Sequence, residues 1–144
     1  RNIVDYRYYR GHFDQFTNTL IAGWAWNGYN DDAVTVHVYI KKNGVTQIVV
    51  PLVANKYRGD LAAAGIGNGS HSFAYNTNLY QIYGAGSYTV DVYAITNCGN
   101  YNPMIENSPL NAYISQNNLN SLRYVKEDAG KFLILKDDVI IQEE

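Results

Sequence analysis

The clearest segment of the chain alternates strictly between apolar and polar side chains. This two-residue period is typical of a strand with one buried face. Asn43-Gly44 follows it, and Asn-Gly between such runs is the strongest short signal for a β-hairpin, so we expect the chain to return through Ala54 as a second strand. The apolar positions are Val34, Val36, Val38 and Ile40, and the polar ones are Thr35, His37, Tyr39 and Lys41.

Further short strands are predicted at residues 19–26, 71–75, 88–96 and 110–115. In the first of these, Leu20, Ala22, Trp24 and Trp26 share one side, with smaller or aliphatic residues on the other. Because burying a large apolar side chain contributes about 3 kcal/mol, we expect Trp24 and Trp26 to pack in the core in preference to forming a platform on which a sugar stacks. The spacing of strands and turns predicts an all-β fold, an immunoglobulin-like β-sandwich of about seven strands.

One short helix is predicted, from Asp60 to Ala64, and no other. Asp60 is interpreted as its N-terminal cap, and Gly65 as the residue of positive φ that ends it. Gly65, Gly67 and Gly69 then form a turn that requires positive φ, not a nucleotide-binding loop, since they follow a helix instead of a strand.

The chain changes character after residue 115. Residues 1–115 are assigned to the β-sandwich module, and 116–144 to a linker (116–120) and a C-terminal β-hairpin. The hairpin strands are predicted at 131–135 and 139–142, with an apolar side made of Phe132, Ile134, Val139 and Ile141. Because a lone hairpin is marginal in water, it is expected to rest on the sandwich, a neighbouring domain or another subunit; we predict contacts outside the sandwich core.

Composition narrows the functional classes. The chain has 144 residues, of which 47% are apolar and 17% charged, with a net charge of -2. It has no basic stripe for nucleic acid and no apolar run long enough for a membrane span. The single cysteine, Cys98, excludes an internal disulfide, and the start at Arg1 indicates a processed or excised chain. Fourteen tyrosines, with abundant Asn and Gly, suit a surface that binds polar ligands such as sugars, although a Tyr-rich sandwich without a ligand fits equally.

No catalytic or metal-binding pattern is recognisable. His12, His37 and His71 lack the spacing of metal ligands, Cys98 has no base near it in sequence, and there is no Gly-x-Ser-x-Gly motif. We therefore expect no enzymatic activity, no cofactor and no metal. Residues 30–32 (Asn-Asp-Asp) are interpreted as a plain loop in preference to a calcium site.

An Arg-Gly-Asp tripeptide, the sequence that some integrins recognise, occurs at residues 58–60. We favour a structural role, in which Arg58 pairs with a carboxylate such as Asp14 or with loop carbonyls.

Five short motifs occur in a set order: Gly11-His12-Phe13-Asp14, Gly23-Trp24-Ala25-Trp26-Asn27, Arg58-Gly59-Asp60-Leu61, a glycine-rich turn from Gly65 to Phe73 that includes His71, and a tail with Asn102-Pro103 and Asn107-Ser108-Pro109. This set resembles a bacterial extracellular β-sandwich accessory module, although Asn27 stands where that pattern has Asp. The resemblance implies a secreted or cell-surface module without catalytic chemistry, and a hydrogen-bonded structural role for His71.

The leading hypothesis is a non-catalytic module that binds a polysaccharide or glycan, or serves adhesion, outside the cell or at its surface. The predicted ligand-binding residues are outward aromatic and polar side chains: Tyr39, His37 and Tyr93, with Tyr29 at the rim. The alternative is a structural subunit of a surface assembly, filament or phage appendage. Tyr6, Tyr8 and Tyr9 and the C-terminal hairpin would then be intersubunit strands.

Overall fold

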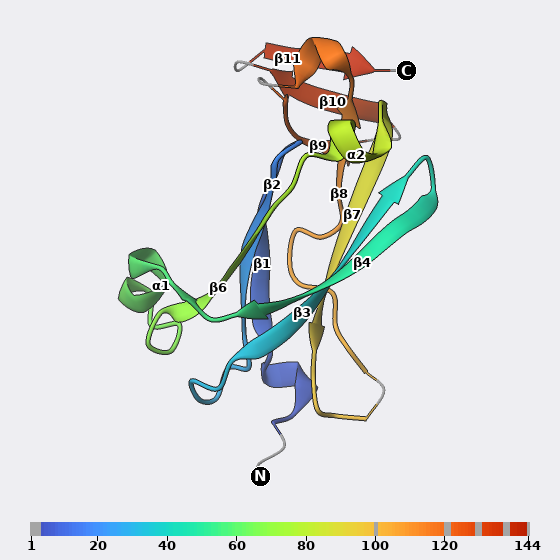
Figure 1. Ribbon diagram of the computed structural model, residues 1–144. Coiled ribbons are helices and arrows are strands. Elements are labelled where there is room, and N and C mark those ends of the chain that lie inside the picture. The colour runs from blue at the N-terminus through green and yellow to red at the C-terminus, as the bar shows by residue number, and fades with distance from the viewer. Residues whose placement is uncertain (1–3, 100, 120–121, 129–130, 137–138, 144) are drawn as a thin grey trace.

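The protein is an all-β sandwich of two antiparallel sheets (Figure 1). The computed structural model describes residues 4–99, 101–119, 122–128, 131–136 and 139–143, with side chains up to residue 119 except those of residues 100 and 118. The small sheet has the order β1-β2-β6-β5, and the large sheet β11-β10-β9-β8-β7-β3-β4. The strands are β1 (Arg10–Phe16), β2 (Leu20–Trp26), β3 (Val34–Lys42), β4 (Val45–Ala54), β5 (Lys56–Tyr57), β6 (Ser70–Asn76), β7 (Gly86–Ile95), β8 (Leu110–Ile114), β9 (Leu122–Asp128), β10 (Lys131–Lys136) and β11 (Val139–Glu143).

The helices are short. α1 (Gly59–Ala63) lies where the sequence predicts a helix, one residue earlier. A second helix, α2 (Leu79–Tyr83), contradicts the expectation of a single one. Its signals are local: Asn78 accepts a hydrogen bond from the Gln81 N–H, and Gly84 ends the helix at φ 88°. Two 3₁₀ turns, η1 (Tyr6–Tyr8) and η2 (Gln116–Asn118), precede β1 and follow β8.

The core lies between the facing sides of the two sheets. On the large sheet it is built by the alternating residues of β3 and β7 that the sequence pattern predicts, such as Val36, Val38, Val90 and Val92, each fully buried. On the small sheet, the buried side chains are Phe13, Phe16, Ile21, Ala25 and Phe73.

The prediction that Trp24 and Trp26 pack in the core is wrong. Ile21, Gly23 and Ala25 are the buried residues of β2, and both tryptophans lie half-exposed on the opposite side. A side chain on Gly23 would come within 2.9 Å of the Phe73 ring. The aromatic rings of β1 and β6 therefore fill the core, and β2 contributes only small or aliphatic side chains to it.

The predicted turn between β3 and β4 is confirmed. Asn43 and Gly44 both have positive φ, at 50° and 84°, as a two-residue hairpin turn requires. The neighbouring backbone holds this turn, because the Asn43 N–H donates to the Ser87 carbonyl and the Asn43 side chain accepts from the Ser87 N–H.

Residues 103–106 join the two sheets along one side of the sandwich. The N–H of Ala94 in β7 donates to the carbonyl of Pro103 at 2.8 Å, and the N–H of Phe13 in β1 donates to the carbonyl of Glu106, also at 2.8 Å. Because both sheets hydrogen-bond to this segment, its backbone is held in place between them.

The C-terminal strands continue the large sheet. β9 pairs with β8 through Asn111 and Val125, and β10 pairs with β9 and β11. The sheet order therefore joins the hairpin to the sandwich, which is one of the three arrangements expected for it. Figure 1 shows these strands at the end of the molecule away from the N-terminus. The predicted apolar side chains of Phe132, Ile134, Val139 and Ile141 lie outside the described side chains.

Candidate functional site

Three of the four predicted ligand-binding residues lie together on the outer face of the large sheet. His37 and Tyr39 come from β3, and Tyr93 comes from β7, directly opposite His37. The rings of Tyr39 and Tyr93 meet edge to face, with centroids 5.5 Å apart. They line a hollow of about 450 Å³, which we call the β3–β7 groove; its walls are His37, Tyr39, Lys41, Thr46, Asp91, Tyr93, Ile95 and Asn102.

The strand alternation explains why these side chains are available to a ligand. Val36, Val38 and Ile40 turn into the core, so their neighbours His37, Tyr39 and Lys41 must face outward. On β7, Val92 and Ala94 turn inward and leave Tyr93 on the same outer face. The half-exposed aromatic rings therefore lie on β3 and β7, each of which pairs with a neighbouring strand on both sides.

An ion pair that the sequence reasoning did not predict lies in the groove. Lys41 Nζ lies 2.8 Å from Asp91 Oδ2, and the Asp91 side chain is only 9% exposed. The Asp91 carboxylate raises the pKa of Lys41 above its ordinary value, so Lys41 stays protonated at neutral pH. The pair gives the groove an ammonium donor and a carboxylate acceptor beside its aromatic rings. No sequence signal links the two residues, because they come from strands that only the sheet order brings together.

Tyr29, the fourth predicted residue, is not among the residues that line the groove. It lies in the loop between β2 and β3, 63% exposed, and its N–H donates to the Asn27 side chain. Asn27 Oδ1 also accepts from the Asn30 N–H, so the amide at the position where the resembled pattern has Asp shapes this loop.

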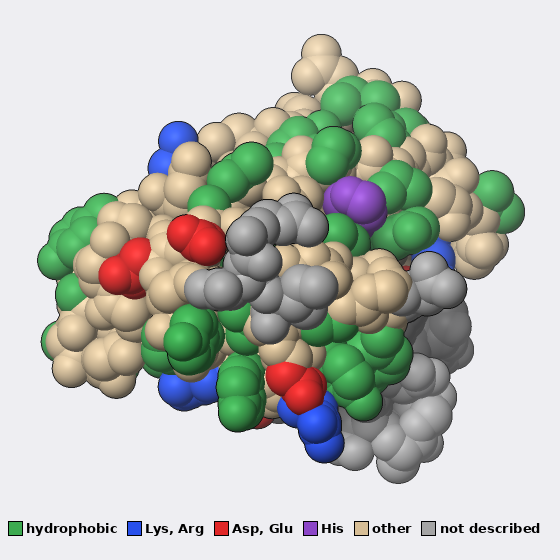
Figure 2. Space-filling model, turned by 90° about the horizontal axis from the view of Figure 1, so that it is seen from below, with side chains coloured by type: hydrophobic (Ala, Val, Ile, Leu, Met, Phe, Trp, Pro, Cys, Tyr) green, Lys and Arg blue, Asp and Glu red, His purple; other side chains and the backbone are tan. Residues whose placement is uncertain are grey.

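Apolar surface extends beyond the groove. Val49 and Val53 of β4 and Met104 are exposed large apolar residues, and Met104 pairs with Tyr93 through an isolated bridge. Figure 2, which views the end of the molecule that carries the N-terminus, shows hydrophobic side chains exposed at several separate places, with a histidine and several charged groups between them.

The motif residues Asp14 and Arg58 form a structural network. Arg58 Nη1 donates to Asp14 Oδ2 at 2.6 Å, while the rest of the guanidinium donates to the Asp60 carboxylate. Asp14 also contacts His12 Nδ1 at 2.8 Å. The predicted Arg58–Asp14 pair is confirmed. Asp60 as the helix cap is wrong: Arg58 is the N-cap residue, and the Asp60 side chain binds it instead.

The glycine-rich turn surrounds a buried histidine. His71 is fully buried, and its Nε2 lies 3.0 Å from Asp31 Oδ1. Asp31 also accepts from the Asn68 N–H, and these two donors lower its pKa below the ordinary 3.8. Gly65, Gly67 and Gly69 all have positive φ, as expected, and a side chain on Gly67 would come within 2.6 Å of His71 Nε2. The predicted structural role of His71 is therefore confirmed.

The described part of the chain shows no group of three or more His, Cys, Asp or Glu side chains placed to hold a metal ion. The thiol of Cys98 donates to the Val4 carbonyl. Among the described residues, no helix has the length and apolar character that crossing a membrane requires. Comparisons with protein-family models, curated proteins and solved structures find no significant match to this chain.

Proposed function

We propose that the chain is a non-catalytic, secreted or cell-surface bacterial module that binds a polysaccharide or glycan in the β3–β7 groove. The observation that carries this proposal is the meeting of Tyr39, Tyr93 and His37 with the Lys41–Asp91 pair on a single open face. An aromatic face accepts the C–H face of a sugar ring, and the flanking charged groups exchange hydrogen bonds with its hydroxyls. The volume of about 450 Å³ lies in the range of ordinary ligand sites.

The open form of the groove favours an extended ligand. It lies across β3 and β7 on the surface of a sheet, so a chain of sugar units can enter and leave at either end. Binding at such a surface relies on stacking and a few hydrogen bonds, so we expect weak affinity per sugar unit.

The test is retention on insoluble polysaccharides and titration with soluble oligosaccharides. We expect Tyr39→Ala and Tyr93→Ala each to lower affinity by about fivefold, since loss of one aromatic contact costs on the order of 1 kcal/mol. Tyr57→Ala is the matched control, because Tyr57 is 66% exposed and does not line the groove. Tyr29→Ala is expected to bind like the parent chain. If the Tyr39 and Tyr93 variants keep full affinity while remaining folded, the groove is not the site.

A structural subunit remains the second candidate, and the edge strand β4 is the observation in its favour. Among the described strands, β4 pairs with β3 alone, and it exposes Val45, Ile48, Val49 and Val53. Exposed apolar edges are templates for pairing with another chain. The N-terminal part of this hypothesis is wrong, because Tyr6–Tyr8 form a 3₁₀ turn and not a strand.

A further inference from the structure

The side of the sandwich opposite the β3–β7 groove carries a second set of aromatic and charged side chains. Trp24 and Trp26 alternate with the buried Gly23 and Ala25 of β2, so both face outward from the small sheet. Arg10 of β1 pairs with Trp26 in the strand register and reaches over both indoles. Its guanidinium carbon lies 5.8 Å from the Trp24 ring centre and 6.0 Å from the Trp26 ring centre. We call Arg10, Trp24 and Trp26 the tryptophan face.

Arg10 differs from the other described arginines in its partners. Arg7 is paired with Asp5, and Arg58 with Asp14 and Asp60. Within the described residues no carboxylate lies within ion-pair distance of Arg10, which is exposed and has only the two indole rings beneath it. The cation–π contacts orient the guanidinium without occupying its N–H donors. Arg10 therefore presents free hydrogen-bond donors at the tryptophan face.

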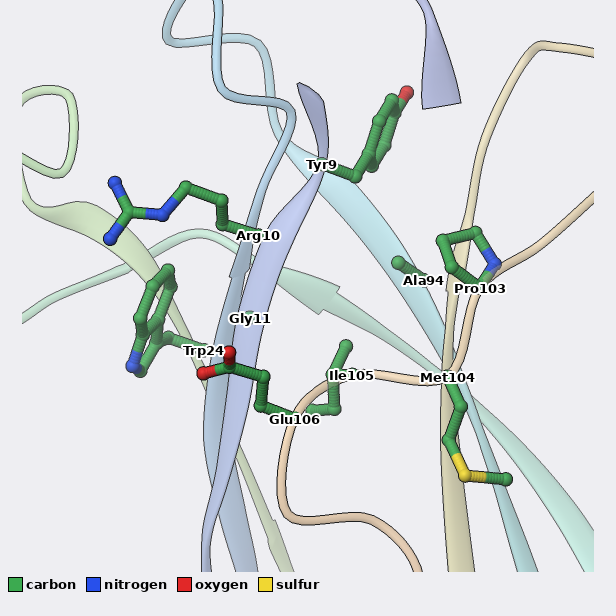
Figure 3. A pocket seen from close by; sticks show the side chains of 9 residues that line it. All are labelled: Tyr9, Arg10, Gly11, Trp24, Ala94, Pro103, Met104, Ile105 and Glu106. Atoms are coloured by element: carbon green, nitrogen blue, oxygen red, sulfur yellow. The ribbon is translucent and has the colours of Figure 1, made fainter. Parts of the chain in front are cut away.

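A hollow of about 180 Å³ adjoins Arg10 and Trp24 (Figure 3). Tyr9, Pro103, Met104 and Ile105 supply apolar wall, and Glu106 supplies a carboxylate on the same hollow as Arg10. This volume is below the roughly 300–1,000 Å³ of sites for drug-sized ligands, so it suits a ligand of one ring.

The walls of this hollow are held in place before any ligand arrives. Glu106 donates its N–H to the carbonyl of Gly11 at 3.2 Å, and Ile105 donates to the carbonyl of Val92 at 3.1 Å. Gly11 forms part of the lining because it has no side chain, and a Cβ there would lie 2.7 Å from the Trp24 carbonyl oxygen. A preorganised wall loses little entropy on binding, which favours recognition of a small ligand.

We propose that the tryptophan face and its hollow form a second binding site, specific for a single neutral hexopyranose unit of a polysaccharide. Trp24 supplies an apolar surface for the C–H groups of the ring. Arg10 donates hydrogen bonds to the sugar hydroxyls, and the Glu106 carboxylate accepts hydrogen bonds from them. Arg10 and Glu106 give the site one positive and one negative charge, so it has no net charge to attract an acidic sugar, and the proposal commits to a neutral one.

Two sites lined by different residues make the module bivalent. They come closest at residues 102–104, where Asn102 lines the groove while Pro103 and Met104 line the hollow. Bivalent binding strengthens retention on a dense polysaccharide far more than binding to a short soluble oligosaccharide. The second site rests on different residues from the first, and each can fail without the other.

The protein carries its own reporter for this site, because Trp24 and Trp26 are the two tryptophans of the chain. The experiment is a titration of the full chain, followed by tryptophan emission, with hexasaccharides of glucose, mannose and galactose and with polygalacturonate. We expect at least one neutral hexose oligomer to change the emission saturably, and polygalacturonate to have no effect. The change should persist in Tyr39→Ala, whose mutation lies on the other sheet.

Variants at the second site make the test specific. Trp26→Phe leaves Trp24 as the reporter and should keep the response. Glu106→Gln and Arg10→Ala should each weaken the affinity by about tenfold, the loss of roughly 1.4 kcal/mol of charged hydrogen bonding. Trp24→Phe, checked for folding by circular dichroism, should retain binding. In a Tyr39→Ala background, which weakens the groove, Trp24→Ala should lower retention on an insoluble form of the same polysaccharide.

Three results would overturn the proposal. One is unchanged tryptophan emission with every saccharide of the panel. Another is a response that is as strong in Arg10→Ala and Glu106→Gln as in the parent chain. The third is a response to polygalacturonate alone that disappears in 0.5 M salt, which would show a site for acidic polymers. Loss of retention in Tyr39→Ala bears only on the groove, so the outcomes for the two sites remain separate.

Discussion

Gly23 lies in the middle of β2, opposite Phe73 of β6 in the strand register. The absence of a side chain there leaves the space that the Phe73 ring fills, and the same alternation turns Trp24 to the outside. A pattern of small residues at core positions beside aromatic residues at outer positions was visible in the sequence. The general preference for burying large apolar side chains pointed to the opposite face.

Asp31 and His71 show how one buried histidine is kept in place. The Asp31 carboxylate can only accept, so His71 Nε2 donates to it. Nδ1 is buried without a hydrogen-bond partner in the described part of the chain. The charge on Asp31 thus orients both His71 and the glycine-rich turn through the Asn68 N–H.

We predict that Asp31→Asn lowers the melting temperature at pH 7, and that the difference from the parent chain disappears at low pH. The folded-state pKa of Asp31 lies below 3.8, so the stability that its charge contributes is complete above that pH. It is lost as the pH falls through the folded-state pKa, where protonated Asp resembles Asn. Thermal melts from pH 2 to pH 7 measure this.

Asp32→Asn is the matched control, since the Asp32 carboxylate has no partner among the described residues. It should leave the melting temperature nearly unchanged over the same range. A constant difference between Asp31→Asn and the parent chain at every pH would show that the charge of Asp31 is not what matters.

The short helix α1 is linked to β1 by the Arg58 side chain. A helix of five residues is too short to be stable alone, and the Arg58 guanidinium links it to Asp14 and Asp60. Asp60 has a lowered pKa because Arg58 donates to it. Both charged residues of the Arg-Gly-Asp sequence are therefore engaged within the protein.

We predict that Arg58→Ala lowers the free energy of unfolding by about 1 kcal/mol, at the upper end for exposed ion pairs because two carboxylates lose their partner. Arg58→Lys should recover only part of this, since an ammonium lacks the planar fork of the guanidinium. Urea unfolding measures both variants. The parent chain should not be retained on integrin-coated surfaces, and retention that an Arg-Gly-Asp peptide competes away would contradict the structural role.

The edge strand β4 has exposed apolar side chains that favour pairing with another chain, and two features that oppose such pairing. Its exposed valines invite pairing with another chain, while Pro51 near its centre has no N–H to donate. The register of β4 also shifts near Ile48. Both features disrupt the regular edge and reduce its capacity to pair with another chain.

Across the whole molecule, the two layers are joined along one side by residues 103–106 and the large sheet continues beyond the small one through β9, β10 and β11. Among the described residues, β8 and β9 share the register pair Asn111 and Val125. The buried core residues lie in β1–β4 and β6–β8, with Leu79 of α2 and Ile105 of the segment before β8.

We predict that a chain truncated after Ser115 still folds, with the β-sheet circular dichroism of the sandwich and a moderately lower melting temperature. Removing β9 leaves β8 as a sheet edge, so the truncated chain should associate more readily than the full chain. Light scattering on both chains, with the full chain expected to be monomeric, measures this. An unfolded truncated chain would show that β9 to β11 complete the sandwich, and a defined oligomer of the full chain would favour the structural-subunit hypothesis.

Much of this fold could be predicted from local sequence patterns alone. The alternation in β3 and β7 follows from the two-residue period of a strand, and the turns at Asn43-Gly44 and Gly65 follow from residues that tolerate positive φ. Three of the proposed site residues were predictable for the same reason, since the outer face of a strand is read directly from its period. Helix α2 was not predicted, because five residues are too few to show the repeat of apolar positions that marks a helix.

The remaining features depend on residues far apart in the chain. Arg58 and Asp14 are 44 positions apart, and Lys41 meets Asp91 only because β3 and β7 are neighbours in the large sheet. Which face of β2 enters the core depends on the rings of Phe13, Phe16 and Phe73 that already fill it. The two-residue period of a strand shows which residues share a face, but not which of the two faces enters the core. The volume available between the sheets decides this, and that volume is a property of the packed structure.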